Sequence, residues 1–329
     1  MNRPYLARAH LATSMLVVLA LFTADYAQGA DAFPARPMRM LVGYPPGGPT
    51  DIVARITAEQ LSAAMGQQMI VDNRPGAGGT ISATILSQAA ADGYTLGLGA
   101  NGEMAIAPNL RAKMPYSPLR DFAPISRVGA GYLALVVPAG LPVKSVSDLI
   151  AVAKAKPGAL NFASSGTGST AHLAGELFKA MAKLDIVHVP YKGAAPALSD
   201  VIGGQVQMLI TGYSGVVPHA KAGRLRVLAV TGGSRLKAAP DLPTIAEAVP
   251  GYEVTSWYGI FAPKGTPRAL IDRFQRAIAA MVQVPAVHAR MVALGIVPEG
   301  SSAQELAAGM KLEIAKWSKV VALAGLTKQ

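Results

Sequence analysis

The sequence predicts an α/β fold with two lobes, built on mostly parallel sheets and joined by two crossover strands at a hinge. Short apolar runs alternate with helix-type runs along nearly the whole chain, which is typical of parallel sheets covered on both faces. Two longer extended segments, 122–129 and 252–261, are placed where a chain would cross between domains. The 329 residues are also enough for two domains of ordinary size.

In the first half of the chain, we expect strands at 38–42, 69–71 and 95–98, separated by helices at 52–65 and 81–90. The second half repeats the alternation. Strands are expected there at 133–137, 160–162, 186–189, 206–210 and 225–230, and helices at 146–155, 171–182 and 195–202. Three helical stretches without a strand finish the chain, and we expect them to pack back onto the first domain.

The two crossover segments divide the chain into a discontinuous first lobe, 33–127 with 257–329, and a second lobe, 128–256. Two crossings make a hinge around a cleft. In open α/β sheets, ligands bind outside the carboxyl ends of the strands, where loops lead into helix N-termini. The loops after strands are therefore the candidate site.

The first 29 residues are predicted to be a signal peptide. Arg3 and Arg8 precede the apolar run 15–22, and the small residues at 27–29 or 30–32 offer a cleavage site. The apolar run is shorter than the ~20 residues that span a bilayer. We expect an exported mature chain.

Composition narrows the function. The chain has no cysteine, which excludes thiolate catalysis and cysteine-based metal sites. Its net charge of +11 favours anionic partners. Lysine and arginine are dispersed, however, and aromatic residues make up only 6%, so no stacking platform is indicated and we expect no nucleic-acid partner. A receptor for anionic solutes fits these values better.

The first informative loop, 43–51, follows strand 38–42 and leads into a helix. Its prolines stiffen the chain, and its glycines allow a sharp turn and a close approach to a ligand. Thr50 or Asp51 would cap the helix, leaving backbone amides to face an anion. The alternative is an ordinary strand-to-helix turn. The candidate ligand-binding residues here are Tyr44, Pro46, Gly47, Gly48 and Asp51.

The second loop, 163–170, also connects a strand to a helix. Its hydroxyl groups and backbone amides can converge on one carboxylate through charge-assisted hydrogen bonds, although a flexible linker is the alternative. The candidate residues are Ser164, Ser165, Thr167, Gly168 and Ser169. The same loop matches the relaxed dinucleotide fingerprint at 166–171, but Asp185 precedes the next strand, where the fingerprint needs an acid after it.

Three further candidate residues lie after other strands: Asn101, Tyr191 and Thr211. Glu103 should also point into the cleft, turning to solvent or meeting an amino group of the ligand. The string 212–215 is one residue short of a hydrolase nucleophile elbow. The histidines show no metal-ligand spacing and are expected to be structural. We therefore expect no catalytic residues, no metal and no cofactor.

Several strings of residues, spread in order over the chain, resemble motifs of the Bug-type extracytoplasmic receptors of tripartite tricarboxylate transporters. They lie at 44–51 with Arg55, 71–79, 92–95, 165–169, 189–193, 203–205, 241–247 and 257–263. The resemblance implies a two-lobed, flytrap-like periplasmic-binding-protein fold and a periplasmic location. It also implies that loops 44–51 and 164–170 hold a small organic carboxylate, and that a membrane permease is the partner.

The chain departs from the family pattern at Glu103, where the family often has threonines and a histidine, and at Thr211, where it often has an acid. The lost acid argues against an amino-acid ligand, and Glu103 argues the other way, so the ligand stays open. We expect a monomeric receptor without enzyme activity. The alternatives are a carboxylate sensor or scavenger without a permease, a nucleotide-dependent enzyme, and a serine hydrolase.

Overall fold

The computed structural model describes residues 33–328 of the chain. The expected signal peptide, residues 1–29, lies outside the described residues. From Pro37 onward the chain forms one compact unit. Within the described part, no helix is both long enough and apolar enough to cross a membrane.

The first sheet contains three parallel strands, β1 (Met38–Val42), β2 (Met69–Asn73) and β3 (Thr95–Ala100). β1 lies between β2 and β3. Four of its five side chains are buried, as its uninterrupted apolar run predicts. The helices α2 (Pro49–Met65) and α3 (Thr80–Ser87) follow β1 and β2 and complete this half of the alternation.

The second sheet contains β5 (Asn161–Ser164), β6 (Val187–Pro190) and β7 (Met208–Gly212), with β5 parallel to both neighbours. β8 (Leu225–Val230) pairs with the crossover strand β4. Each strand predicted from the alternation begins and ends within two residues of its expected bounds, except for the segment 133–137. That segment is part of the longer strand β4.

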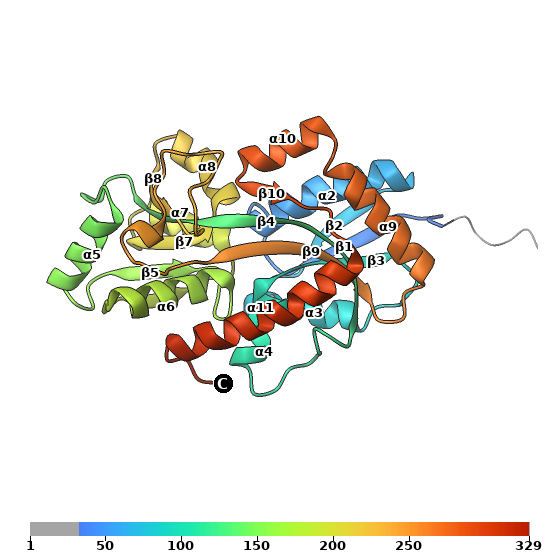
Figure 1. Cartoon of the computed structure of the whole chain (residues 1–329), viewed down its shortest axis with the longest axis horizontal. Helices are drawn as coiled ribbons and strands as arrows, with labels where there is room; N and C mark the ends of the chain where they lie inside the picture. The colour runs from blue at the N-terminus through green and yellow to red at the C-terminus, as the bar shows by residue number, and fades with distance from the viewer. Residues whose placement is uncertain (1–32, 329) are drawn as a thin grey trace, which may run out of the picture. The chain divides into compact units, whose positions relative to one another are not determined.

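Two long strands connect the sheets, as predicted. β4 (Phe122–Pro138) pairs antiparallel with β9 (Thr255–Pro263) along its first part and with β7 and β8 from Leu133 onward. Figure 1 shows β4 in green and β9 in orange running side by side between the two groups of strands. The fold is therefore α/β with two lobes, and each lobe is built on one sheet.

The helices of the described residues cover these sheets. Beyond α2 and α3 they are α4 (Ala107–Leu110), α5 (Val146–Ala155), α6 (Thr170–Ala182), α7 (Ala194–Ile202), α8 (Tyr213–Lys221), α9 (Arg268–Met281), α10 (Pro285–Ala293) and α11 (Ala303–Leu323). Short helical turns occupy Ala77–Gly79, Gly102–Ile106 and Ile245–Glu247, of which Gly102–Ile106 is a π-helix. The sequence pattern missed α8, because Gly215 and Pro218 interrupt its helical signal.

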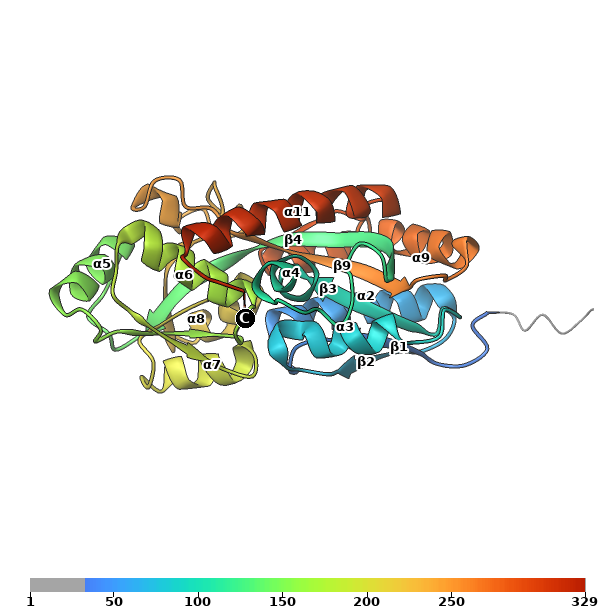
Figure 2. The ribbon, with the colours of Figure 1, turned by 90° about the horizontal axis from the view of Figure 1, so that it is seen from below.

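The expectation that the C-terminal stretches lack a strand is wrong. β10 (Ile296–Pro298) lies between α10 and α11 and pairs antiparallel with β4. Three residues ending in proline are too short a run to signal a strand, and only the neighbouring β4 backbone makes them one. α9 packs on α2 as expected, whereas α11 contacts both β4 and α6 (Figure 2).

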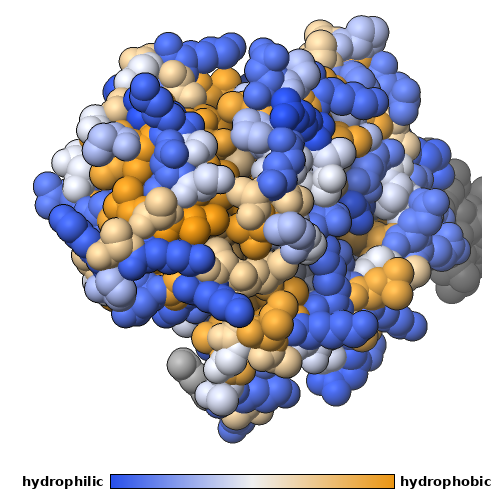
Figure 3. All heavy atoms as spheres, turned by 60° about the vertical axis from the view of Figure 1, so that its left-hand side comes forward, coloured by the Kyte–Doolittle hydropathy of each residue, from blue (hydrophilic) through white to orange (hydrophobic). Residues whose placement is uncertain are grey.

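Each sheet has a hydrophobic core of its own. Phe162, Phe178 and Tyr252 are central to the core of the second sheet, and Trp317 from α11 joins them. Phe261 belongs to a separate core on the first sheet. On the face drawn in Figure 3, apolar residues gather near the centre among hydrophilic ones. The buried cores hold the two sheets rigid, so the loops at their edges can meet in a defined geometry.

Candidate ligand-binding site

The loop after β1 turns sharply into α2 through Gly47, whose φ of 81° is in the left-handed region that favours glycine. Gly48 is the N-cap of α2 and makes no side-chain cap, so the expected capping by Thr50 or Asp51 is wrong. Asp51 instead accepts a hydrogen bond from the amide of Gly47 at 2.9 Å. A side chain in the first turn of α2 therefore stabilises the loop that precedes this helix.

Asp51 is buried beneath this loop and does not line the cavity to which Tyr44, Gly48 and Pro49 contribute. Its carboxylate accepts hydrogen bonds from Arg55 Nε at 2.8 Å and from Asn73 Nδ2 at 2.9 Å. Burial acts to raise the pKa of Asp51, but the hydrogen bonds from Arg55, Gly47 and Asn73 hold that pKa below its usual value. The structure thus places Asp51 in support of the loop.

Tyr44 lies at the start of the same loop with its ring buried. Its hydroxyl is 3.1 Å from the carbonyl oxygen of Gly78 and 3.3 Å from Oε2 of Glu103. Glu103 also accepts a hydrogen bond from the amide of Ala100 at 2.8 Å. The expectation that Glu103 faces solvent or a ligand is wrong, because the π-helix Gly102–Ile106 turns its side chain into the protein.

Burial raises the pKa of Glu103 to about 7, although hydrogen bonds from its own amide, from Ala100 and from Tyr44 oppose the shift. The carboxyl group is therefore buried with its hydrogen bonds made inside the protein.

In the loop after β5, Ser165 lines a cavity, whereas Ser164 and Ser169 are engaged within the protein. Ser164 is fully buried, and its Oγ lies 2.7 Å from Nε2 of His188. Ser169 is the N-cap of α6 and accepts a hydrogen bond from the amide of His172 at 3.2 Å. Thr167 is exposed at the tip of the loop.

A cavity of about 40 Å³ lies where these two loops meet. Four helices begin at its wall: α2 at Pro49 and Thr50, α6 at Thr170 and Ala171, α7 at Ala194, and α8 after Gly212. The first amides of a helix have no partner within the helix, and its N-terminus carries a partial positive charge. Four such ends therefore make one strongly anion-favouring position.

The rest of the wall is uncharged. Tyr44, Ser165, Thr211, Ser256 and Tyr258 carry hydroxyl groups, and Ala100 and Leu133 are apolar. None of the described residues that line this cavity is an acid or a base. Burial raises the pKa of Tyr258 to about 12, so its hydroxyl keeps its proton at neutral pH. The cavity therefore offers donors to an anion and no competing negative charge.

Other predicted site residues lie elsewhere. Asn101 does not line the 40 Å³ cavity. Its amide nitrogen donates to Glu313 at 3.1 Å, and its oxygen accepts from the amide of Trp257 at 2.9 Å, so it ties β9 to α11. Pro46 and Gly47 are exposed at the outer side of their loop. The position of Asn101 after a strand does not predict these contacts, because the π-helix that follows the residue is not visible in the sequence pattern.

Thr167, Gly168 and Tyr191 line a second and larger cavity of about 720 Å³, which adjoins the first at Tyr44 and Ser165. The hydroxyl of Tyr191 donates to Asp200 at 2.6 Å. Burial, followed by this hydrogen bond, raises the pKa of Tyr191 to about 12. Its ring is thereby held at the edge of the cavity.

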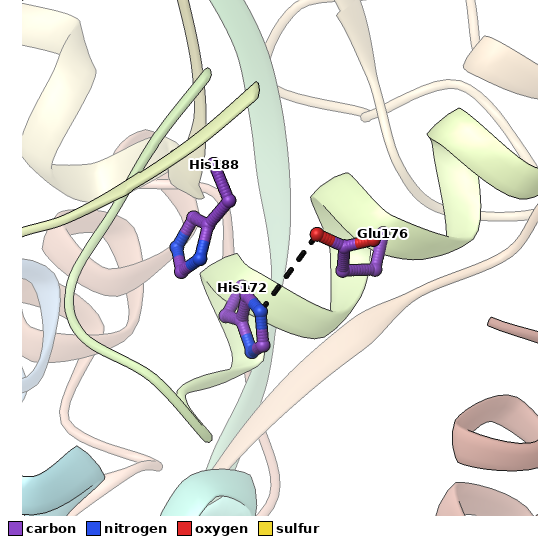
Figure 4. A group of neighbouring side chains, drawn as sticks. All are labelled: His172, Glu176 and His188. Atoms are coloured by element: carbon purple, nitrogen blue, oxygen red, sulfur yellow. Dashed lines mark ion pairs between the residues drawn. The ribbon is translucent and has the colours of Figure 1, made fainter. Parts of the chain in front are cut away.

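Behind the loop after β5, three side chains that are distant or unremarkable in the sequence come together. Figure 4 shows His172 and Glu176 on α6 facing His188 on β6. The rings of His172 and His188 stack with centroids 4.1 Å apart, and His172 Nε2 lies 3.9 Å from Glu176 Oε1. In residues 33–328 this is the only group of three that offers ligand atoms to a metal ion.

Hydrogen bonds already occupy two of the four ring nitrogens in this group. His188 Nε2 bonds Ser164, and His172 Nδ1 accepts from the amide of Gly168 at 3.3 Å. Burial lowers the pKa of His172 to about 4. Burial, with the charges of His172 and Lys179, lowers the pKa of His188 to about 3. The two neutral rings hold the loop 164–169 through their hydrogen bonds to Ser164 and Gly168. The spacing of the histidines in the sequence does not predict this role.

The family comparison agrees with this geometry. Residues 53–326 match the model of the family described as "Tripartite tricarboxylate transporter family receptor". The chain belongs to this receptor family. Its relatives include a "UPF0065 protein in tcbD-tcbE intergenic region" of Pseudomonas sp. (strain P51), 39% identical over 93% of this chain and 91% of the relative.

Protein BugT of Bordetella pertussis (strain Tohama I) is 38% identical to this receptor, over 94% of the chain and 97% of BugT. Among solved structures, "R. palustris Rpa4515 with adipate" is 38% identical, with a TM-score of 0.88 and coverage of 90% and 100% of the two chains. "MatC (Rpa3494) from Rhodopseudomonas palustris with bound malate" is 32% identical, with a TM-score of 0.83 and coverage of 88% and 100%. The two-lobed receptor fold and the Bug-type family are thus both confirmed.

Proposed function

We propose that this protein is a periplasmic receptor that captures a small organic carboxylate in the 40 Å³ cavity and presents it to a tripartite tricarboxylate-type transporter. The observation that carries the proposal is the convergence of four helix N-termini on a cavity without charged side chains. An anion bound there is stabilised by backbone amides and hydroxyl groups, and no acidic side chain forms part of the cavity wall.

The magnitudes are sufficient for a transport receptor. A charge-assisted hydrogen bond contributes about 1.5–3 kcal/mol, and each helix N-terminus about 0.3–1 kcal/mol more. Micromolar binding corresponds to about −8 kcal/mol. A carboxylate that accepts three or four such bonds reaches this range after the cost of ordering the ligand.

The solved relatives support the ligand class. One is bound to adipate and another to malate, and both of these ligands are organic carboxylates. We propose that the present chain also binds a carboxylate, and that it acts as a monomer with a membrane permease as its partner. A role as a sensor or scavenger component without a permease is the second form of the same binding function.

We also propose the arrangement of the lobes. Residues 33–127 and 257–329 form one lobe, residues 128–256 form the other, and the hinge runs through β4 and β9. The change of partners along β4 supports a hinge within this strand, because Tyr132 pairs with β9 whereas Leu133 pairs with β7.

We propose that the protein binds its ligand without turning it over. The short contact between Ser164 and His188 is the one arrangement in the described chain that favours a hydrolase. Ser164 is fully buried, however, and lines neither cavity. The low pKa of His188, caused first by burial, also makes its ring a weak base. The burial of Ser164 and the low pKa of His188 favour a structural role for their hydrogen bond, which orders the loop after β5.

Isothermal titration calorimetry of the mature protein tests the proposal, with linear carboxylates, amino acids and nucleotides as ligands. We expect a carboxylate to bind, and Ser165→Ala to weaken that binding about tenfold, because the side chain lines both cavities and supplies a charge-assisted hydrogen bond. Ser199→Ala is the matched control, since Ser199 is exposed on α7. Binding of nucleotides alone, or equal affinity of Ser165→Ala and the wild type, would contradict the assignment.

A further inference from the structure

Glu103 is a buried acid whose hydrogen-bond partners are all neutral. Only 2% of the residue is exposed, and its carboxyl group accepts hydrogen bonds from the amide of Ala100 and from its own amide. The third donor is the hydroxyl of Tyr44, 3.3 Å from Oε2. No Lys, Arg or His of the described residues acts on this carboxyl group. A buried carboxylate without a cation is costly, so conditions that favour its protonated form change the local hydrogen bonds.

Tyr44 connects this acid to the 40 Å³ cavity, because its side chain is part of the cavity wall and Glu103 is not. A tyrosine hydroxyl has a single proton to donate. Two acceptors inside the protein already compete for it, the carbonyl oxygen of Gly78 at 3.1 Å and Glu103 Oε2 at 3.3 Å. An anion in the cavity is a third acceptor. Burial, followed by the charge of Glu103, raises the pKa of Tyr44 well above its usual value, so Tyr44 keeps its proton.

Close packing holds the carboxyl group and the phenol together. A Cβ added to Gly79 would lie 2.5 Å from Glu103 Oε2, and a Cβ added to Gly102 would lie 2.5 Å from the hydroxyl oxygen of Tyr44. Glycine at both positions therefore allows the two side chains and the loop 76–79 to approach each other. In this packing, a change in the protonation of Glu103 acts first on the hydrogen bond that it shares with Tyr44.

The other titratable groups around Glu103 supply no counter-charge. Tyr116 donates from its hydroxyl to the carbonyl oxygen of Glu103 at 2.7 Å, and burial raises the pKa of Tyr116 above its usual value. The charge of Arg111 acts on Tyr116, and Tyr258 acts on Tyr44. The described residues that share a small cavity with Glu103 include no other charged side chain. A proton taken up at this position is therefore held by Glu103.

We propose that Glu103 is a positioning residue for the bound carboxylate, which takes up a proton from the solvent as the anion binds and so leaves the hydroxyl of Tyr44 free to donate into the cavity. Ionised Glu103 repels an anion beside Tyr44 and competes for the hydroxyl proton. Protonated Glu103 donates its own O–H to the Tyr44 oxygen, and both effects end. The proposal rests on the proposed function, because it assumes that an anion occupies the 40 Å³ cavity.

The sign of the coupling follows from the charges. A bound anion disfavours ionised Glu103 and raises its pKa further, from a value that burial already places at about 7. The complex then holds more protons than the free protein, so carboxylate affinity is highest at low pH and falls as the pH rises through 7. Carboxylic acid ligands titrate at about pH 4. The pKa values of His172 and His188, about 4 and about 3, also lie below this interval.

Calorimetry of the wild-type protein measures the coupling in two buffers of different ionisation enthalpy. The probes are adipate, malate and the linear carboxylates used to test the proposed function. The difference in apparent enthalpy between the buffers gives the number of protons taken up with each ligand. A rise of about one in the pKa of Glu103 predicts uptake of about half a proton at about pH 7.5, and a loss of affinity of about eightfold from about pH 6 to about pH 9.

Glu103→Gln keeps the size of the side chain and cannot titrate. We expect it to take up no proton and to keep the low-pH affinity of the wild type over the whole interval. Glu299→Gln is the matched control, because burial also raises the pKa of Glu299, which does not line the 40 Å³ cavity. It should retain the proton uptake. Tyr44→Phe leaves the carboxyl group in place and removes the shared hydroxyl, so its proton uptake should fall well below the wild-type value.

The outcomes separate the two proposals. If the wild type binds a carboxylate without taking up a proton, or if Glu103→Gln or Tyr44→Phe keeps the full uptake, the role of Glu103 is wrong while the carboxylate receptor stands. If the wild type binds no carboxylate at any pH, the proposed function itself fails, and this proposal fails with it.

Discussion

At the scale of single residues, the site uses side chains that never touch the ligand. His188 fixes Ser164, and His172 receives the amide of Gly168, so the loop that presents Ser165 is held from behind. The two stacked rings can do this only while both are neutral, because protonation would remove the acceptor at His172 Nδ1 and two imidazolium rings would repel each other at short range. Glu176 lies 3.9 Å from the ring of His172, and the charge of Lys179 on the same helix acts on His188.

The histidine pair predicts a dependence of stability on pH. Both pKa values are lowered from the usual 6.5, to about 4 and about 3. Between these values and pH 6.5, the two histidines bind protons in the unfolded chain but not in the folded chain. The stability that the neutral histidine pair contributes is therefore complete above pH 6.5 and is lost as the pH falls toward 4. The melting temperature of the wild type should fall more steeply over this interval than that of His172→Gln, His188→Gln.

Glu103 has the opposite sign, since its pKa is raised from 4.5 to about 7, and its contribution to stability is present at low pH and lost as the pH rises through 7. Glu103 is present in both the wild type and the double histidine variant, so the difference between their melting curves reports on the histidines alone. Equal slopes for the wild type and the variant would show that the histidine pair does not resist protonation.

At the scale of elements, the strand-to-helix connections carry the function. Each of β1, β5, β6 and β7 leads into a helix whose first turn reaches the small cavity. Asp51, in the first turn of α2, bonds back to Gly47 and across to Asn73 at the end of β2. One buried carboxylate thus joins the loop, the helix and the neighbouring strand.

Asp51→Ala should lower the free energy of unfolding by about 1–3 kcal/mol, because it leaves hydrogen-bond donors of Gly47, Asn73 and Arg55 without their partner. It should also weaken carboxylate binding by disordering the loop. Urea unfolding and calorimetry measure the two effects.

Asp148→Ala is the control, since Asp148 occupies the same position in the exposed capping box of α5. It should lower the free energy of unfolding less than Asp51→Ala does, because Asp148 is exposed to solvent, and it should leave carboxylate affinity unchanged. A loss of affinity in both variants would indicate that general destabilisation, and not the loop, causes the effect of Asp51→Ala.

At the scale of the whole molecule, β4 and β9 let two sheets with separate cores meet around one ligand position. The N-termini of α2 and α7 face each other across it, because a Cβ added to Gly48 would lie 3.7 Å from the Cβ of Ala194. This separation is within the roughly 3.5–4.5 Å that a disulfide bond requires.

Gly48→Cys, Ala194→Cys should therefore form an intramolecular disulfide bond on oxidation and should slow the entry and release of a carboxylate until a reductant is added. The chain has no cysteine of its own, so any such bond joins the introduced pair. Gel mobility and stopped-flow binding measure the two results. Gly140→Cys, Ala194→Cys is the control, since Gly140 has no neighbour within 4 Å. Equal cross-linking in both pairs would contradict the facing arrangement of α2 and α7.

The sequence by itself determined the α/β alternation, the two crossover segments and the two loops that meet at the cavity. Those features depend on local apolar runs and on glycine and proline in turns, which can be recognised without knowing distant contacts. Only the tertiary structure decided which side chains face the cavity. Ser165 faces it, whereas Ser164 is held by a histidine 24 residues away, and Glu103 is turned inward by a π-helix. Such outcomes depend on partners that are far apart in the chain, so the pattern of residues cannot show them.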